Sequence, residues 1–247
     1  MPVVFVHGNP ETAELWGPLR TALGRTDIVT PRLPGFGAPT PAGWGATRAE
    51  YTRWLIGEIA ALGEPVDLVG HDWGGGLVMG VAIERPDLLR SWTCDLLGCF
   101  HPTYVWHDAA QVWQTAGAGE DAVAGMVELP TADKEALFVG LGVPADIART
   151  FAGALDAEMG RCILALYRSA AQPALANLGT RLAAARQRPG LALIPTADAY
   201  TGGPERAAAM AAVAGARAVH LDGVGHWWMF DDLDARASLL SEFWAQA

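Results

Sequence analysis

Cysteine, clustered basic residues and long apolar runs are all scarce in this sequence. The 247 residues include three cysteines, which form no CxxC pair and no Cys/His cluster, so a zinc site is not expected. The chain has no block of Lys or Arg and a formal net charge of −10, so neither nucleic acid nor an anionic membrane is expected as a partner. No apolar run reaches the roughly 20 residues that span a bilayer.

The odd number of cysteines favours a reducing compartment. The chain begins MPVVFVHG, which lacks the pattern of a secretory leader, so we expect a cytoplasmic protein. Hydrophobic residues make up 51% of the chain and charged residues 18%, which is ordinary for a globular protein. The length suits one large α/β domain with an insertion.

Strand-like and helix-like patterns alternate along most of the chain. Short apolar or β-branched runs predict six strands, at Val3–Val6, Asp27–Thr30, Val66–Val69, Ser91–Leu97, Leu191–Ile194 and Ala218–Leu221. Helical spacing predicts helices at Leu15–Leu23, Ala49–Leu62, Gly76–Glu84, Pro204–Val213 and Leu233–Trp244. Such alternation predicts a sheet of about six parallel strands with helices on both faces.

The alternation breaks in the middle of the chain. From about His101 to Arg186 the patterns are helical, and no segment is convincing as a strand. We therefore expect a core made of residues 1–100 and 187–247, with residues 101–186 inserted after the fourth strand as a helical cap. The cap is expected over the carboxyl ends of the strands, where α/β sheets bind ligands.

The stretch VDLVGHDWGGG, residues 66–76, carries the strongest chemical signal. Asp72 lies between Gly70 and Gly74 at a strand-to-helix turn, in the place of the serine in the G-x-S-x-G nucleophile elbow. The glycines allow a strained turn that lifts the central side chain. The following helix directs its N-terminus at the carboxylate, which is expected to lower its pKa. The alternative is an ordinary turn with Asp72 as helix cap.

Three further segments fit the same arrangement. The loop at His7-Gly8-Asn9-Pro10 is expected to supply one backbone N–H to an oxyanion hole, and Trp73 the other, although a plain turn also explains this loop. His226, in the glycine-rich segment GVGHW, is the candidate general base. Asp198, just past the strand Leu191–Ile194, is the candidate acid that orients it. The competing acid is Asp95, which is less favoured because it is expected inside its strand.

With these motifs, HGNP, GHDWGG and GVGHW, the chain resembles the α/β-hydrolase superfamily, and within it the enzymes with an aspartate nucleophile. These are the epoxide hydrolases and the haloalkane dehalogenases. The resemblance implies that Asp72 attacks a carbon atom and forms an ester, which water activated by His226 hydrolyses without a cofactor. It also implies a cis peptide bond before Pro10.

The leaving group distinguishes the two families. Tyr167, in the segment LALYRS, resembles the cap tyrosine with which epoxide hydrolases bind the epoxide oxygen, although a half-buried helical tyrosine would look the same. Many epoxide hydrolases have a second cap tyrosine, which has no clear equivalent here. Its position corresponds to Ala109 or a neighbour within Trp106–Gln114, and Tyr104 is the candidate to replace it. The favoured substrate is accordingly a small apolar epoxide.

Haloalkane dehalogenases instead hold the halide between a tryptophan and an asparagine, which Trp73 and Asn9 resemble. Trp73 is shared with epoxide hydrolases, so only Asn9 favours a dehalogenase. Tyr167 and the segment Gly225-His226-Trp227 look more like an epoxide hydrolase. A non-catalytic member of the fold that binds a small ligand is a third alternative, but a binding protein needs no general base. The sequence leaves the oligomeric state open.

Overall fold

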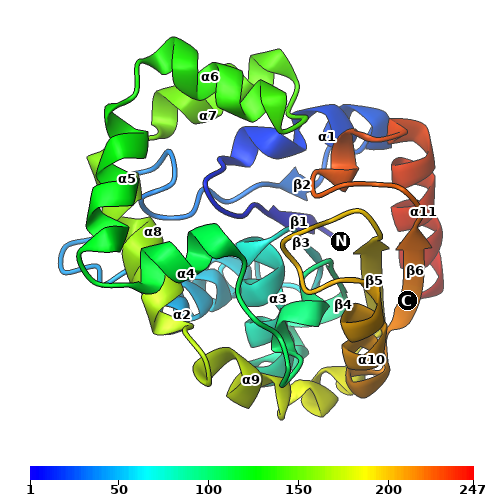
Figure 1. Cartoon of the computed structure of the whole chain (residues 1–247). Coiled ribbons are helices and arrows are strands. Elements are labelled where there is room, and N and C mark those ends of the chain that lie inside the picture. Colours follow the sequence, from blue (N-terminus) through cyan, green and yellow to red (C-terminus); the bar gives the residue numbers. More distant parts are fainter.

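The computed structural model describes all 247 residues and is built around one parallel sheet (Figure 1). Its six strands lie in the order β2-β1-β3-β4-β5-β6, and every neighbouring pair is parallel. The strands are β1 (Val3–Val6), β2 (Ile28–Val29), β3 (Val66–Gly70), β4 (Leu89–Cys94), β5 (Gly190–Pro195) and β6 (Arg217–Leu221). The expectation of six parallel strands is therefore confirmed.

Helices cover both faces of the sheet. The pair α1 (Gly17–Leu23) and α11 (Leu233–Gln246) packs together on one face, and the other face carries α2 (Arg48–Ala60), α3 (Trp73–Glu84) and α10 (Pro204–Ala214) (Figure 1). Short 3-10 turns lie at η1 (Ala13–Trp16), η2 (Pro86–Leu88), η3 (Leu97–Phe100), η4 (Leu182–Gln187) and η5 (Trp228–Phe230). Strands β1 and β3 are buried along their whole length, as apolar strands at the centre of a two-sided parallel sheet should be.

Between β4 and β5 the chain forms six α-helices and no strand (Figure 1). They are α4 (Asp108–Gln114), α5 (Ala118–Glu128), α6 (Thr131–Gly140), α7 (Ala145–Ala154), α8 (Ala157–Ser169) and α9 (Ala174–Gly179). Helices α4, α5 and α8 pack on one another, whereas α6 and α7 form a hairpin. No helix in the structure combines the length and the apolar character that crossing a membrane requires.

One strand boundary corrects the sequence analysis. We expected the fourth strand to run from Ser91 to Leu97, with Asp95 inside it, but β4 ends at Cys94 and Asp95 follows it. The reason is that Cys94 pairs with Gly70, the last residue of β3, so no ladder partner on that side remains for Asp95. The stated ground for disfavouring Asp95 was therefore wrong.

Candidate active site

Asp72 lies at the predicted sharp turn between β3 and α3. Its backbone has φ 50° and ψ −125°, a conformation that is strained for a residue with a side chain. A Cβ atom at Gly70 would lie 2.5 Å from the carbonyl carbon of Gly74, and one at Gly74 would collide with the carbonyl oxygen of Val6. Both positions therefore require glycine, which explains the G-x-D-x-G spacing.

The carboxylate of Asp72 is buried and held by the backbone. Its Oδ1 accepts the backbone N–H of Asn9 at 2.9 Å. A Cβ atom at Gly8 would collide with this carboxylate, so the loop after β1 can approach it only because residue 8 is glycine. The Asn9–Pro10 peptide bond is cis, as expected.

The pKa of Asp72 moves in the direction opposite to our expectation. Burial is the largest influence and raises the pKa to about 6, and the nearby charge of Glu11 adds to the rise. The positive charge of His226 and the N–H of Trp73 act in the lowering direction but do not offset burial. The expected lowering by the helix N-terminus was therefore wrong in its net sign.

His226 and Asp198 form a pair beside Asp72. The loop after β6 brings His226 Nδ1 to 2.8 Å from Asp198 Oδ2, and Asp198 Oδ1 accepts the backbone N–H of Tyr200 at 2.7 Å. Because Nδ1 is held in this way, Nε2 faces Asp72, with 3.9 Å between Nε2 and Asp72 Oδ2. Burial lowers the pKa of His226, but the Asp198 carboxylate outweighs it, so that the pKa is raised. An imidazole oriented in this way can take a proton from water.

Asp95 has different partners. Its Oδ2 lies 2.5 Å from His71 Nδ1 and accepts the indole N–H of Trp228 at 2.6 Å, while its Oδ1 accepts the backbone N–H of Asp72 at 2.9 Å. It has no contact with His226 within hydrogen-bond distance. Of the two candidate acids, Asp198 is therefore the one that lies against the histidine.

His71 and Glu11 complete a buried charged cluster that the sequence analysis missed. His71 Nε2 lies 3.1 Å from Glu11 Oε1. Burial would lower the pKa of His71, but the carboxylates of Glu11 and Asp95 raise it well above its usual value. Burial would likewise raise the pKa of Glu11, yet His71 brings it down to about 2. The sequence signal that could have revealed this cluster is Glu11, the acidic residue directly after the HGNP motif.

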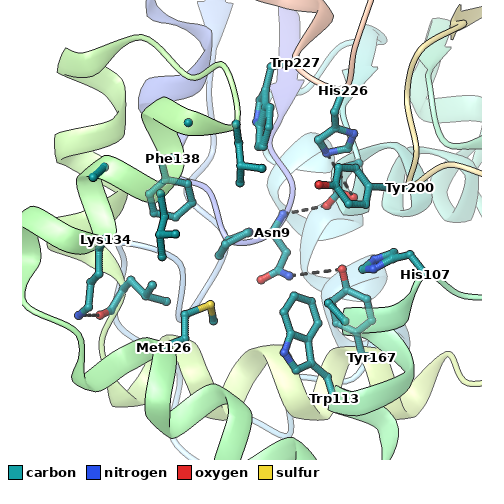
Figure 2. A pocket seen from close by; sticks show the side chains of 18 residues that line it. Asn9, His107, Trp113, Met126, Lys134, Phe138, Tyr167, Tyr200, His226 and Trp227 are labelled. Carbon is teal, nitrogen blue, oxygen red and sulfur yellow. Dashed lines mark hydrogen bonds and ion pairs between the residues drawn. The ribbon is translucent and has the colours of Figure 1, made fainter.

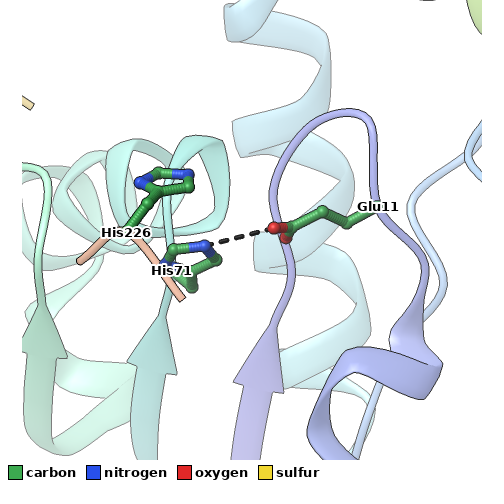
Figure 3. Close-up of side chains that lie close together, drawn as sticks. All are labelled: Glu11, His71 and His226. Carbon is green, nitrogen blue, oxygen red and sulfur yellow. Dashed lines mark ion pairs between the residues drawn. The ribbon is translucent and has the colours of Figure 1, made fainter. Parts of the chain in front are cut away.

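The ligand atoms of Glu11, His71 and His226 lie within 4.8 Å of one another, close enough to suggest a metal site (Figure 3). However, most of the ring nitrogens of the two histidines already contact carboxylates within the protein. Both nitrogens of His71 face carboxylates, and Nδ1 of His226 is bonded to Asp198. Glu11 itself accepts the backbone N–H of Gly8 and the indole N–H of Trp227, each at 2.7 Å. These groups fit an internal ion network rather than a set of three free metal ligands.

A cavity of about 470 Å³ lies over these groups (Figure 2). Four of the predicted site residues line it, namely Asn9, Asp72, Tyr167 and His226. The remaining lining comes from the loops after β1, β5 and β6, from helices α4, α5 and α6, and from the residues His107 before α4 and Leu155 after α7, and it is mainly hydrophobic. A mainly apolar cavity with a few convergent polar groups is typical of a small-molecule site.

Tyr167 projects from α8 into this cavity. The side-chain N–H of Asn9 donates to its hydroxyl oxygen at 3.5 Å. Burial raises the pKa of Tyr167, and the side chains of Trp73 and Asn9 act in the lowering direction. Trp73 does not line the cavity itself; it is stacked on Trp106 with ring centroids 5.7 Å apart and meets the ring of Tyr167 edge-on.

The substitute for a second cap tyrosine is not Tyr104. Its hydroxyl donates to the carbonyl of Tyr200 at 2.8 Å, and its side chain does not line the cavity. Ala109 does line it, together with His107 and Tyr200, which the sequence analysis missed. His107 Nδ1 accepts the N–H of Ala110 at 3.3 Å, and burial lowers the pKa of His107, so its Nε2 carries the single ring proton.

Comparison with known proteins agrees with this architecture. The sequence profile of the alpha/beta hydrolase family matches residues 3–239. Haloalkane dehalogenase 2 from Mycobacterium tuberculosis is 40% identical over 93 residues, 36% of this chain and 32% of that protein. (E)-2-((N-methylformamido)methylene)succinate hydrolase from Acinetobacter baylyi is 30% identical over 110 residues, 44% of this chain and 41% of that protein. The matches thus span less than half of these curated relatives.

Solved structures agree over a greater length. A loop variant of the haloalkane dehalogenase DbeA from Bradyrhizobium elkanii superposes with a TM-score of 0.73, covering 99% of this chain and 89% of the other at 21% sequence identity. At that identity the likeness concerns the fold alone. It confirms the fold class that the motifs predicted.

Proposed function

Because the chain belongs to the alpha/beta hydrolase family, we propose that it hydrolyses substrates at a saturated carbon, through an ester formed on Asp72. One observation carries the proposal: the residue at the tip of the elbow is a carboxylate, and a histidine-acid pair lies directly behind it. A carboxylate that attacks a saturated carbon gives an ester, and an attack on its carbonyl restores the enzyme.

The two oxygens of Asp72 have separate roles in this mechanism. Oδ2, which faces His226, forms the bond to the substrate carbon as the bond to the leaving group breaks. Oδ1 becomes the ester carbonyl and stays within reach of the N–H groups of Asn9 and Trp73. Water then loses a proton to His226 Nε2 and attacks the ester carbon, while the two N–H groups stabilise the oxyanion. Collapse of this intermediate releases the alcohol, which takes the proton from His226, and leaves Asp72 as a carboxylic acid. Loss of that proton to the solvent restores the carboxylate.

We propose an epoxide as the substrate class because of the surroundings of Tyr167. Its hydroxyl oxygen accepts the side-chain N–H of Asn9 at 3.5 Å, and its side chain lines the cavity. The phenol proton is therefore free to point at a substrate. As Asp72 opens the ring, charge develops on the epoxide oxygen, and the phenol can stabilise this charge and supply the proton. The product is a vicinal diol.

A haloalkane is the second candidate, and a specific observation favours it. The side-chain amide of Asn9 donates to the Tyr167 hydroxyl, the ring of Trp73 lies edge-on to the Tyr167 ring, and N–H donors of this kind suit a halide ion. The haloalkane dehalogenases among the relatives support this alternative. In this structure the Tyr167 oxygen accepts the Asn9 donor, so halide binding requires Tyr167 to move aside.

The helical segment 101–186 acts in this proposal as the cap that encloses a small apolar substrate. It contributes Tyr167 together with the aromatic and aliphatic lining of the cavity. Apolar walls exclude bulk water, so that the proton and the charge are handled by protein groups rather than by solvent.

A paired product assay tests the proposal. Purified protein is incubated with styrene oxide and, separately, with ethylene dibromide, and diol and bromide are measured alongside an Asp72→Ala variant. We expect diol from the native protein and none from the variant. Bromide without diol would favour the dehalogenase, and equal turnover by Asp72→Ala would refute the covalent mechanism.

A further inference from the structure

The cavity has a charged group at each end. His226, which lies against Asp72, and Tyr200 lie at one end, and Lys134 lies at the other, with Met126 and Phe138 between them (Figure 2). A substrate that fills this space would therefore meet apolar walls along its middle. The far end is the part of the cavity that the proposed reaction does not use.

Lys134 is unusual in three respects. It is the only lysine of the chain, and only 7% of its surface is exposed. Its ammonium has three donors, of which one is used, in a 2.8 Å bond from Nζ to the carbonyl oxygen of Leu155. No carboxylate oxygen lies within 4.0 Å of Nζ.

The bond to Leu155 accounts for only part of this arrangement. Leu155 closes helix α7, so Lys134 ties α6 to α7 and interacts favourably with the helix end. A neutral donor could make the same bond without the cost of burying a charge. No contact within the protein explains why this position, at the end of the cavity and without a counter-ion, carries a positive charge.

We propose that Lys134 binds the carboxylate of an amphiphilic substrate whose reacting carbon lies at Asp72. The inference rests on the proposed function, and it narrows the substrate class to apolar chains that carry an epoxide or a halogen at one end and a carboxylate at the other. A single ammonium matches the single charge of a carboxylate. Lys134 is the only lysine or arginine of the lining.

The test compares two substrates that differ only in charge, the epoxide of undecylenic acid and its methyl ester. The quantity measured is the ratio of kcat/KM for the acid to kcat/KM for the ester within each protein, so a general loss of active enzyme cancels. We expect the native protein to prefer the acid at least tenfold. Lys134→Gln keeps a donor for the Leu155 carbonyl but no charge, and it should bring the ratio to about one, while Lys134→Arg should restore most of the preference.

A binding measurement separates this inference from the proposed reaction. Undecanoate and undecanol, which cannot react, are titrated calorimetrically into the native protein and Lys134→Gln. Undecanoate should bind the native protein at least tenfold more tightly than it binds the variant, and undecanol should bind both alike. If this binding result is obtained but neither epoxide is turned over, the carboxylate-binding role of Lys134 is supported and the proposed epoxide hydrolysis is rejected. Equal undecanoate affinity in the two proteins, or an acid preference that survives in Lys134→Gln, would overturn the role of Lys134.

Discussion

Replacing Tyr167 by Phe removes one oxygen from the centre of the proposed site. The aromatic ring keeps its contacts with Trp73 and Trp106, but the hydroxyl that accepts from Asn9 is lost. In epoxide opening this hydroxyl would donate to an oxygen that is gaining charge. A hydrogen bond to a charged group contributes about 1.5–3 kcal/mol, and each 1.4 kcal/mol corresponds to roughly a factor of ten in rate.

We therefore expect Tyr167→Phe to lower kcat/KM for styrene oxide by roughly ten- to a hundredfold. A halide needs no proton, and loss of the hydroxyl frees the side-chain N–H of Asn9, so bromide release from ethylene dibromide should not fall. Tyr51→Phe is the matched control, because Tyr51 is also buried but its hydroxyl donates to the carbonyl of Pro34, away from the cavity. Full epoxide turnover by Tyr167→Phe would refute the reasoning and favour the dehalogenase.

Three further outcomes follow from the geometry. With a pKa of about 6 for Asp72, single-turnover alkylation should slow as the pH falls through about 6, because protonation removes the nucleophile; a flat rate from pH 5 to about pH 8 would contradict this. Asp198→Asn should lower steady-state turnover by a factor on the order of 10³ to 10⁴, since the ring of His226 loses its orienting carboxylate; a loss below tenfold would reassign the acid. Gly74→Ala should lower the free energy of unfolding in urea by about 1–3 kcal/mol through collision with Val6, whereas Gly125→Ala, with open space around it, should not be destabilising.

The parts of the site that the sequence could predict are those fixed by strand ends. In a parallel sheet all the carboxyl ends meet at one edge, so the motifs around Asn9, Asp72, Asp198 and His226 had to converge once the strands were recognised. Local chemistry also sufficed for the elbow, since the close approach of backbone at Gly70 leaves no room for a side chain.

The rest depends on tertiary contacts without a local pattern. Glu11 and His71 are 60 positions apart in sequence and become an ion pair only because β1 and β3 are neighbours. The direction of the Asp72 pKa was wrong because burial, which a sequence does not report, outweighs the helix terminus. His107 and Lys134 could not be assigned to the cavity because the packing of the inserted helices decides which of their faces point inward.

The central claim is that an ester forms on Asp72 and that His226 is needed to hydrolyse it. His226→Gln should therefore still react with styrene oxide but stop at the ester, so that intact-protein mass spectrometry shows one added substrate mass and peptide mapping assigns it to Asp72. The double variant Asp72→Ala/His226→Gln should gain no mass. An unmodified His226→Gln protein, under conditions in which the native protein turns styrene oxide over, would contradict the account, as would a label on any other residue.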